Sequence, residues 1–165
     1  MIARYNTIKD FDMHQGDGIN VSLWMQGCEH KCKGCYSPQT WDFNTGYIFT
    51  DDTIEEIIHL LSKDKGIHKN LSILGGETLS HNKIPYITKL VQEVKRKLPE
   101  TKIFLWTGYT WNCIHHYELM KSIDVLVDGM YIKELHEPSR YKGSSNQRVI
   151  DVQNSLENKQ VILYD

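Results

Sequence analysis

The chain has 165 residues, a formal net charge of −2, and 40% hydrophobic and 24% charged residues. This composition is typical of a globular protein and excludes a disordered or fibrous one, and the length suits a single domain spanning residues 1–165. The small net charge provides no overall basic field for nucleic acid or an anionic membrane, so we expect neither as a partner.

Short apolar runs alternate with helical patterns along the chain. In chain order, the patterns predict strands at 21–25, 71–74, 103–106, 124–127 and 161–164. Helices are expected at 52–61, 85–98 and 111–120, the last one weaker. Asp52 and Glu55 are a plausible capping pair for the first helix.

Strands that alternate with helices predict an α/β fold with parallel strands and helices packed outside them. A complete eight-fold βα barrel usually needs about 200 residues or more, so we expect part of a barrel or an open sheet. Four polar or glycine-rich signals each follow the end of a predicted strand: Cys28, Gly75-Gly76-Glu77, Thr107-Gly108 and Asp128-Gly129. Ligands bind at this edge of parallel sheets.

Three of the four cysteines lie between residues 28 and 35, and Cys113 stands alone. This is a poor disulfide framework, and the N-terminus lacks the apolar core of a signal peptide, so we expect a cytoplasmic protein with metal-binding thiols. The spacing suits zinc or an iron–sulfur cluster. Zinc usually takes four ligands, which His30 or Cys113 would have to complete, whereas three thiolates leave one iron of a four-iron cluster open.

The segment Cys28-Glu-His-Lys-Cys32-Lys-Gly-Cys35-Tyr36 resembles the signature of the radical S-adenosylmethionine superfamily. It is most similar to the anaerobic ribonucleoside-triphosphate reductase activating proteins, which share Cys-x-His-x-Cys-x-Gly-Cys-Tyr and a following Thr-Trp, here Thr40-Trp41. The resemblance extends from about Trp24 to Val152. It implies an incomplete, TIM-like βα barrel of the radical SAM type with a mostly parallel sheet.

The resemblance also implies a set of site residues. Cys28, Cys32 and Cys35 would hold a [4Fe-4S] cluster, and Gly34, Cys35 and Tyr36 would lie beside bound S-adenosylmethionine. The further cofactor contacts that we expect are Gly75, Gly76, Glu77, Thr107 and Asp128. Gly75-Gly76-Glu77 matches a segment that contacts the amino group of the methionine moiety, although Thr78 replaces the proline common in the family. No catalytic residue is expected beyond the cluster and its ligands.

The implied activity is reductive cleavage of S-adenosylmethionine at the cluster. The resulting 5′-deoxyadenosyl radical would generate a glycyl radical on the large subunit of anaerobic ribonucleoside-triphosphate reductase, with a low-potential electron donor such as flavodoxin. The alternatives are an activase of another glycyl-radical enzyme, of the formate-lyase type, and a non-enzymatic zinc-binding interaction module. The polar loop 143–148 would contact either the cofactor or the partner, and the role of His30 stays open between a cluster-tuning bond and a solvent-facing position.

Overall fold

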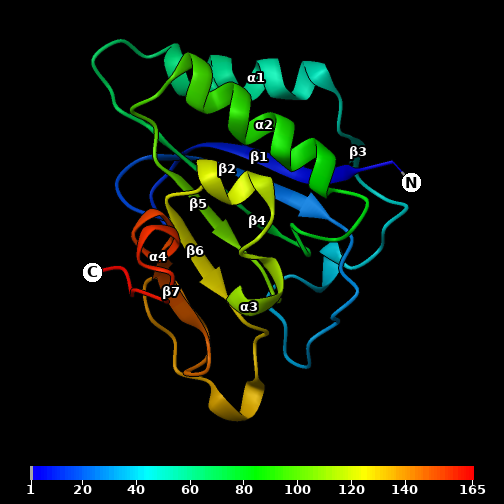
Figure 1. Ribbon diagram of the computed structural model, residues 1–165. Coiled ribbons are helices and arrows are strands. Elements are labelled where there is room, and N and C mark those ends of the chain that lie inside the picture. The colour runs from blue at the N-terminus through cyan, green and yellow to red at the C-terminus, as the bar shows by residue number, and fades with distance from the viewer. Residues whose placement is uncertain (1) are drawn as a thin grey trace.

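The computed structural model describes residues 2–165 as a mixed α/β fold around one seven-stranded sheet (Figure 1). The strands are β1 (Arg4–Asp12), β2 (Asn20–Gln26), β3 (Tyr47–Ile48), β4 (Asn70–Gly75), β5 (Ile103–Trp106), β6 (Val125–Asp128) and β7 (Arg148–Asp151). The α-helices are α1 (Asp51–Ser62), α2 (Ile84–Lys97), α3 (Trp111–Ile114) and α4 (Val152–Asn158). Three short 3₁₀ turns lie at Pro38–Thr40, Glu118–Ser122 and Lys133–Leu135.

The strand order is β3-β1-β2-β4-β5-β6-β7. The neighbouring pairs β2–β4, β4–β5 and β5–β6 are parallel, so four adjacent strands form a parallel centre. The flanking pairs β1–β2, β1–β3 and β6–β7 are antiparallel. The sheet is open, which confirms the expected α/β class and the parallel centre of the sheet.

One face of the sheet packs against helices and the other borders a cavity. Helices α1 and α2 lie side by side over one face (Figure 1), where Leu23, Ile73 and Leu105 are fully buried in the hydrophobic core. Because side chains alternate along a strand, their neighbours Trp24, Leu74 and Trp106 point to the opposite face. These three residues line the main cavity of the protein. This opposite face therefore borders the cavity, whereas the helix-covered face packs into the core.

Two helical expectations were wrong in detail. Helix α1 is capped by Thr50, whose backbone N–H bonds the Thr53 hydroxyl at 3.0 Å in a capping box, rather than by Asp52 and Glu55. The helix expected at 111–120 ends at Ile114 and gives way to a 3₁₀ turn, because Tyr117 is extended (φ −67°, ψ 138°).

The strand expected at 161–164 was also wrong. This segment lies beside β7, but it forms only the single bridge of Leu163 to Ile150, too short a pairing for a strand. Within residues 2–165, none of the helices has the length and apolar character needed to cross a bilayer.

Candidate active site and metal centre

The main cavity has a volume of about 440 Å³ and lies at the carboxyl ends of the parallel strands. Most of the side chains and glycines predicted from the sequence line it: Cys28, Cys32, Cys35, Tyr36, Gly75, Gly76, Glu77 and Thr107. Segments from different strand ends thus converge on one space, as expected for a parallel sheet.

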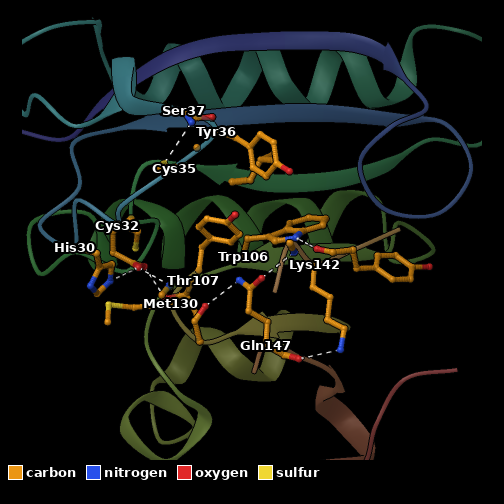
Figure 2. A pocket seen from close by; sticks show the side chains of 18 of the residues that line it. His30, Cys32, Cys35, Tyr36, Ser37, Trp106, Thr107, Met130, Lys142 and Gln147 are labelled. Atoms are coloured by element: carbon orange, nitrogen blue, oxygen red, sulfur yellow. Dashed lines mark hydrogen bonds and ion pairs between the residues drawn. The ribbon is translucent and has the colours of Figure 1, made fainter. Parts of the chain in front are cut away.

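The cysteine loop, residues 28–36, follows β2 and forms one end of the cavity (Figure 2). Its three cysteines are free thiols of intermediate burial. The backbone N–H of Cys35 donates to the carbonyl of Cys32 at 3.1 Å, and the N–H of Ser37 donates to the Cys35 sulfur at 3.3 Å. Backbone donors to cysteine sulfurs are among the features that tune iron–sulfur clusters.

Burial affects the ionisation of two of the three thiols. Burial raises the pKa of the Cys28 thiol, and burial together with the neighbouring Cys28 and Cys35 raises the pKa of Cys32. Cys113 is exposed beside Thr110, 3.6 Å from its hydroxyl, and is not part of this cavity wall. A donor set of three soft thiolates in one loop suits an iron–sulfur cluster with an open corner.

Across residues 2–165, no three His, Cys, Asp or Glu side chains are arranged as ligands of a single metal ion.

Gly75 and Gly76 stand where two backbones cross. A Cβ on Gly75 would lie 2.5 Å from the backbone nitrogen of Met25, and Gly75 has a φ of +113°. A Cβ on Gly76 would lie 2.9 Å from the Thr40 carbonyl and would also contact the Gly27 carbonyl oxygen. Only glycine permits this approach, so the pair fixes the end of β4 against the start of the cysteine loop.

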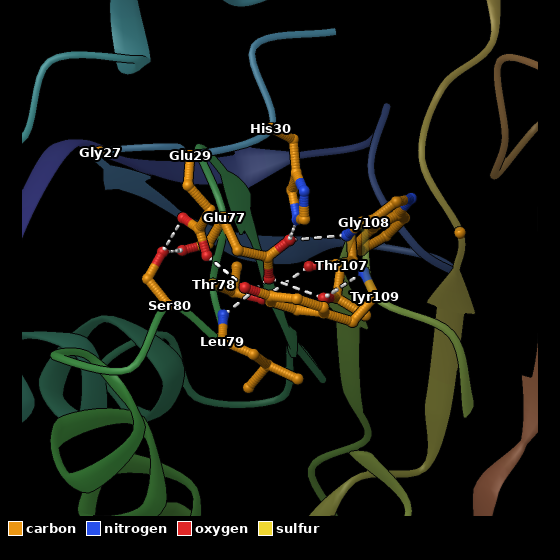
Figure 3. A network of polar contacts seen from close by, with 12 residues as sticks. Gly27, Glu29, His30, Glu77, Thr78, Leu79, Ser80, Thr107, Gly108 and Tyr109 are labelled. Carbon is orange, nitrogen blue, oxygen red and sulfur yellow. Dashed lines mark hydrogen bonds and ion pairs between the residues drawn. The ribbon is translucent and has the colours of Figure 1, made fainter. Parts of the chain in front are cut away.

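Glu77 is buried, with 1% of its surface exposed, and its carboxylate accepts four hydrogen bonds (Figure 3). One oxygen accepts from the N–H of Leu79 at 2.8 Å and the hydroxyl of Thr107 at 2.6 Å. The other accepts from the N–H of Gly108 at 2.7 Å and Nε2 of His30 at 2.7 Å. A carboxylate only accepts, so Nε2 is the protonated nitrogen of His30. This bond raises the pKa of His30, against the opposing effect of burial.

A second carboxylate, Glu29 of the cysteine loop itself, joins the loop to the segments that follow β4 and β5. Glu29 accepts hydrogen bonds from the hydroxyls of Tyr109 at 2.5 Å and Ser80 at 2.6 Å (Figure 3). Burial opposes ionisation of Glu29, but these two hydroxyls outweigh it and hold its pKa below the ordinary value. The Tyr109 hydroxyl thus bonds a carboxylate of the protein itself.

The rim segment, residues 138–147, covers the far end of the cavity, where Trp24 and Trp106 provide an aromatic wall. Nε1 of Trp106 donates to the carbonyl of Tyr141 at 2.7 Å, and the Tyr141 hydroxyl bonds Asp17. Sequence reasoning missed this wall, because Trp24 and Trp106 have the pattern of ordinary strand residues. The polar loop that it did single out is tied down by Gln147, whose amide nitrogen donates to the Gly129 carbonyl at 3.0 Å.

Two predicted contacts lie outside the cavity lining. Asp128 is buried, accepts two hydrogen bonds from Arg148 at 3.1 and 2.6 Å, and accepts the N–H of Trp111 at 2.8 Å at the start of α3. Gly34 lies beside the side chains of Tyr131 and Lys133, within about 3.5 Å of where its Cβ would be. Their cofactor contacts stay predictions.

Comparison with known proteins agrees with this arrangement. The family model of the 4Fe-4S single cluster domain matches residues 14–150, and the chain belongs to that family. Its relatives define the group more closely. An anaerobic ribonucleoside-triphosphate reductase-activating protein of Enterobacteria phage T4 is 39% identical over 145 residues, 88% of this chain and 92% of the relative.

Proteins of the same name from Vibrio cholerae serotype O1 and Escherichia coli K12 are 36% and 35% identical. These matches cover 87% and 88% of this chain, and 94% and 96% of the relatives. The chain is therefore a member of the anaerobic ribonucleoside-triphosphate reductase-activating protein family. The family recognised from the cysteine loop is confirmed, and the matching family model describes a 4Fe-4S domain.

Proposed function

We propose that this chain is a radical S-adenosylmethionine enzyme that generates a glycyl radical on the large subunit of anaerobic ribonucleoside-triphosphate reductase. The single observation that carries the proposal is the position of Cys28, Cys32 and Cys35 at one end of the 440 Å³ cavity. The names of the relatives supply the partner, and they favour the reductase over a formate-lyase type of target. A low-potential donor such as flavodoxin and a cytoplasmic location remain expectations.

The three cysteines would hold a [4Fe-4S] cluster through their thiolates. When bound, such a cluster supplies the low-potential electron for reductive cleavage of the sulfonium of S-adenosylmethionine. Binding requires that the thiols lose their protons, and burial raises the pKa of Cys28 and Cys32 in the free chain. Iron loading should therefore release protons.

The rest of the cavity would position the substrate and exclude water. Leu74 and the aromatic wall of Trp24 and Trp106 give the cavity an apolar side, and residues of the rim segment line it as well. We propose that this face belongs to an incomplete βα barrel of the radical SAM type, formed by the single domain of residues 1–165. Its open edge would admit a glycine-bearing loop of the partner. Holding the reacting groups together in a dry space accounts for much of the rate advantage of such a site.

The cavity mouth offers side chains that suit a macromolecular partner. Tyr36 and Met130 both line the cavity and are 72% and 45% exposed. Tyr36 lies 6.0 Å from Tyr131 and 6.5 Å from His136 between ring centroids. Exposed aromatic groups beside an active-site opening are typical of surfaces that bind another protein.

The test begins with anaerobic purification and iron analysis. We expect a brown protein with about four irons per chain. Single serine substitutions at Cys28, Cys32 and Cys35 should each abolish iron binding, whereas Cys113→Ser should leave it unchanged.

The second step is electron spin resonance after mixing the loaded protein with S-adenosylmethionine, a reductant and the reductase. A glycyl-radical signal is expected with the wild type and the Cys113 variant only. Loaded protein that consumes S-adenosylmethionine with the reductase present but leaves no glycyl signal would exclude the reductase as its target.

A further inference from the structure

The buried carboxylate of Glu77 has no acceptor capacity left for a ligand. A carboxylate offers about four lone-pair positions, and each of the four is used by a donor of the protein at 2.6–2.8 Å. Figure 3 shows these donors surrounding both oxygens. A substrate ammonium group would have to displace one of them, so the side chain of Glu77 is committed to the protein.

Of the four donors to Glu77, His30 is the most distant in sequence. Its side chain is 12% exposed and reaches Glu77 across 47 positions of the sequence. His30 lies between Cys28 and Cys32, two residues from each. Fixing its ring therefore fixes the backbone turn that carries two of the three expected ligands.

Gly108 forms the seat for this ring. A Cβ on Gly108 would lie 2.6 Å from Cδ2 and 2.7 Å from Nε2 of His30, so any larger residue would push the ring off Glu77. Gly108 is not one of the glycines with a positive φ, so no left-handed backbone conformation requires glycine at this position. The glycine is needed here for space, because the imidazole occupies the place of a side chain.

Resting on the three-cysteine ligation proposed above, we propose that Glu77, His30 and Gly108 form a clamp that positions the cysteine loop for the cluster. Glu77 is then a positioning residue that acts through His30, and it makes no contact with substrate. The clamp joins the loops that follow β2, β4 and β5, so the loop is already ordered before iron arrives. Partners of this kind around metal sites typically alter metal affinity by about 10- to 100-fold when removed.

The decisive experiment measures the metal-free, reduced chain by amide hydrogen exchange. The variants are His30→Ala, Glu77→Gln, Gly108→Ala and the double variant of His30 and Glu77, with His81→Ala as the matched control at an exposed histidine. We expect exchange of residues 28–36 to accelerate about tenfold or more in each single variant, because loss of a hydrogen bond to a charged acceptor makes local opening easier. The double variant should add nothing further, and the control should match the wild type. His30→Gln restores an N–H donor and should recover slow exchange at least in part.

A second measurement follows iron release to a chelator from the loaded proteins. Iron release should be faster in the same variants, and the order of the variants by release rate should match their order by amide-exchange rate. His30→Ala leaves the other three bonds of Glu77 intact, so it keeps the test available where Glu77→Gln does not fold.

The clamp is refuted if His30→Ala and Gly108→Ala exchange like the wild type, or if Glu77→Gln alone weakens binding of S-adenosylmethionine with His30→Ala unaffected. The exchange measurement needs neither iron, S-adenosylmethionine nor the reductase. A wild type that binds no iron would thus defeat the proposed ligation, whereas the exchange rates of the metal-free variants would still decide whether the clamp exists.

Discussion

Lys83 allows a sharp test of the packing beneath the cysteine loop. Its side chain is fully buried at the start of α2, and Nζ donates to the carbonyl of Glu77 at 2.6 Å and to the carbonyl of Gly27. Burial lowers the pKa of Lys83 from 10.5 to about 8. The perturbation that we consider is Lys83→Met, which keeps the length of the side chain and removes the charge.

The pH dependence follows from that shift. Between pH 8 and 10.5 the folded chain has lost the Lys83 proton while the unfolded chain still binds it, so the free energy of unfolding rises with pH in this window. The full difference corresponds to about 3 kcal/mol at 1.36 kcal/mol per pKa unit. Below pH 8 both states are protonated and the contribution is constant.

The assay is urea unfolding of the metal-free, reduced chain at about pH 7.5 and pH 10. Comparing wild type with Lys83→Met isolates Lys83, because the other titrating groups are present in both. The wild type should gain about 2–3 kcal/mol relative to the variant over this range. Lys89→Met, at an exposed lysine on the same helix, serves as the control and should show no such gain. A constant difference between wild type and Lys83→Met would refute the reasoning.

Three further substitutions test contacts in and around the cavity. Gly76→Ala places a methyl group against the carbonyls of Gly27 and Thr40, on either side of the cysteine loop. It should lower the free energy of unfolding, measured with urea, by about 1–3 kcal/mol. Trp106→Phe removes the donor to Tyr141, which should cost about 1 kcal/mol and accelerate amide exchange in the rim segment. Asp128→Asn weakens the pair with Arg148 and should cost about 2 kcal/mol, with affinity for S-adenosylmethionine unchanged. A loss of that affinity in a stable Asp128→Asn protein would instead support the cofactor contact predicted from the sequence.

The parallel centre of the fold was predictable because its strands are continuous apolar runs. Every residue of 71–74 and 103–106 except the half-buried Trp106 is buried, and mostly apolar buried runs are typical of parallel sheets. Strand β1 was not predictable in the same way, because Arg4–Asp12 mixes charged and apolar residues and is mostly half-buried. Strand β7 follows a polar stretch of sequence, and its pairing along its length is with β6. Their strand character comes from tertiary contacts rather than from local pattern.

The cysteine loop was found from spacing alone, but the partners of its neighbours were not. His30 and Glu77 are separated by 47 positions, and no periodicity connects them. Their pairing depends on the parallel register of β2 and β4, which aligns Met25 with Gly75 and so brings the two following loops together. That register, combined with the space required at Gly108, is the signal from which the pair could have been predicted.

The polar residues at the strand ends largely satisfy one another. All four acceptor positions of Glu77 are used by donors of the protein, Glu29 accepts from two hydroxyls, and Asp128 accepts from Arg148 and a backbone N–H. Facing the cavity between them are the three thiols, the glycine backbone and an aromatic wall. A ligand in this space would therefore meet the thiols or the metal that they hold, backbone groups, apolar surface and the basic side chains of Arg140 and Lys142. The carboxylates of Glu77, Glu29 and Asp128 would instead hold the loops at the strand ends together, and acidic residues would then mark a ligand site without binding the ligand.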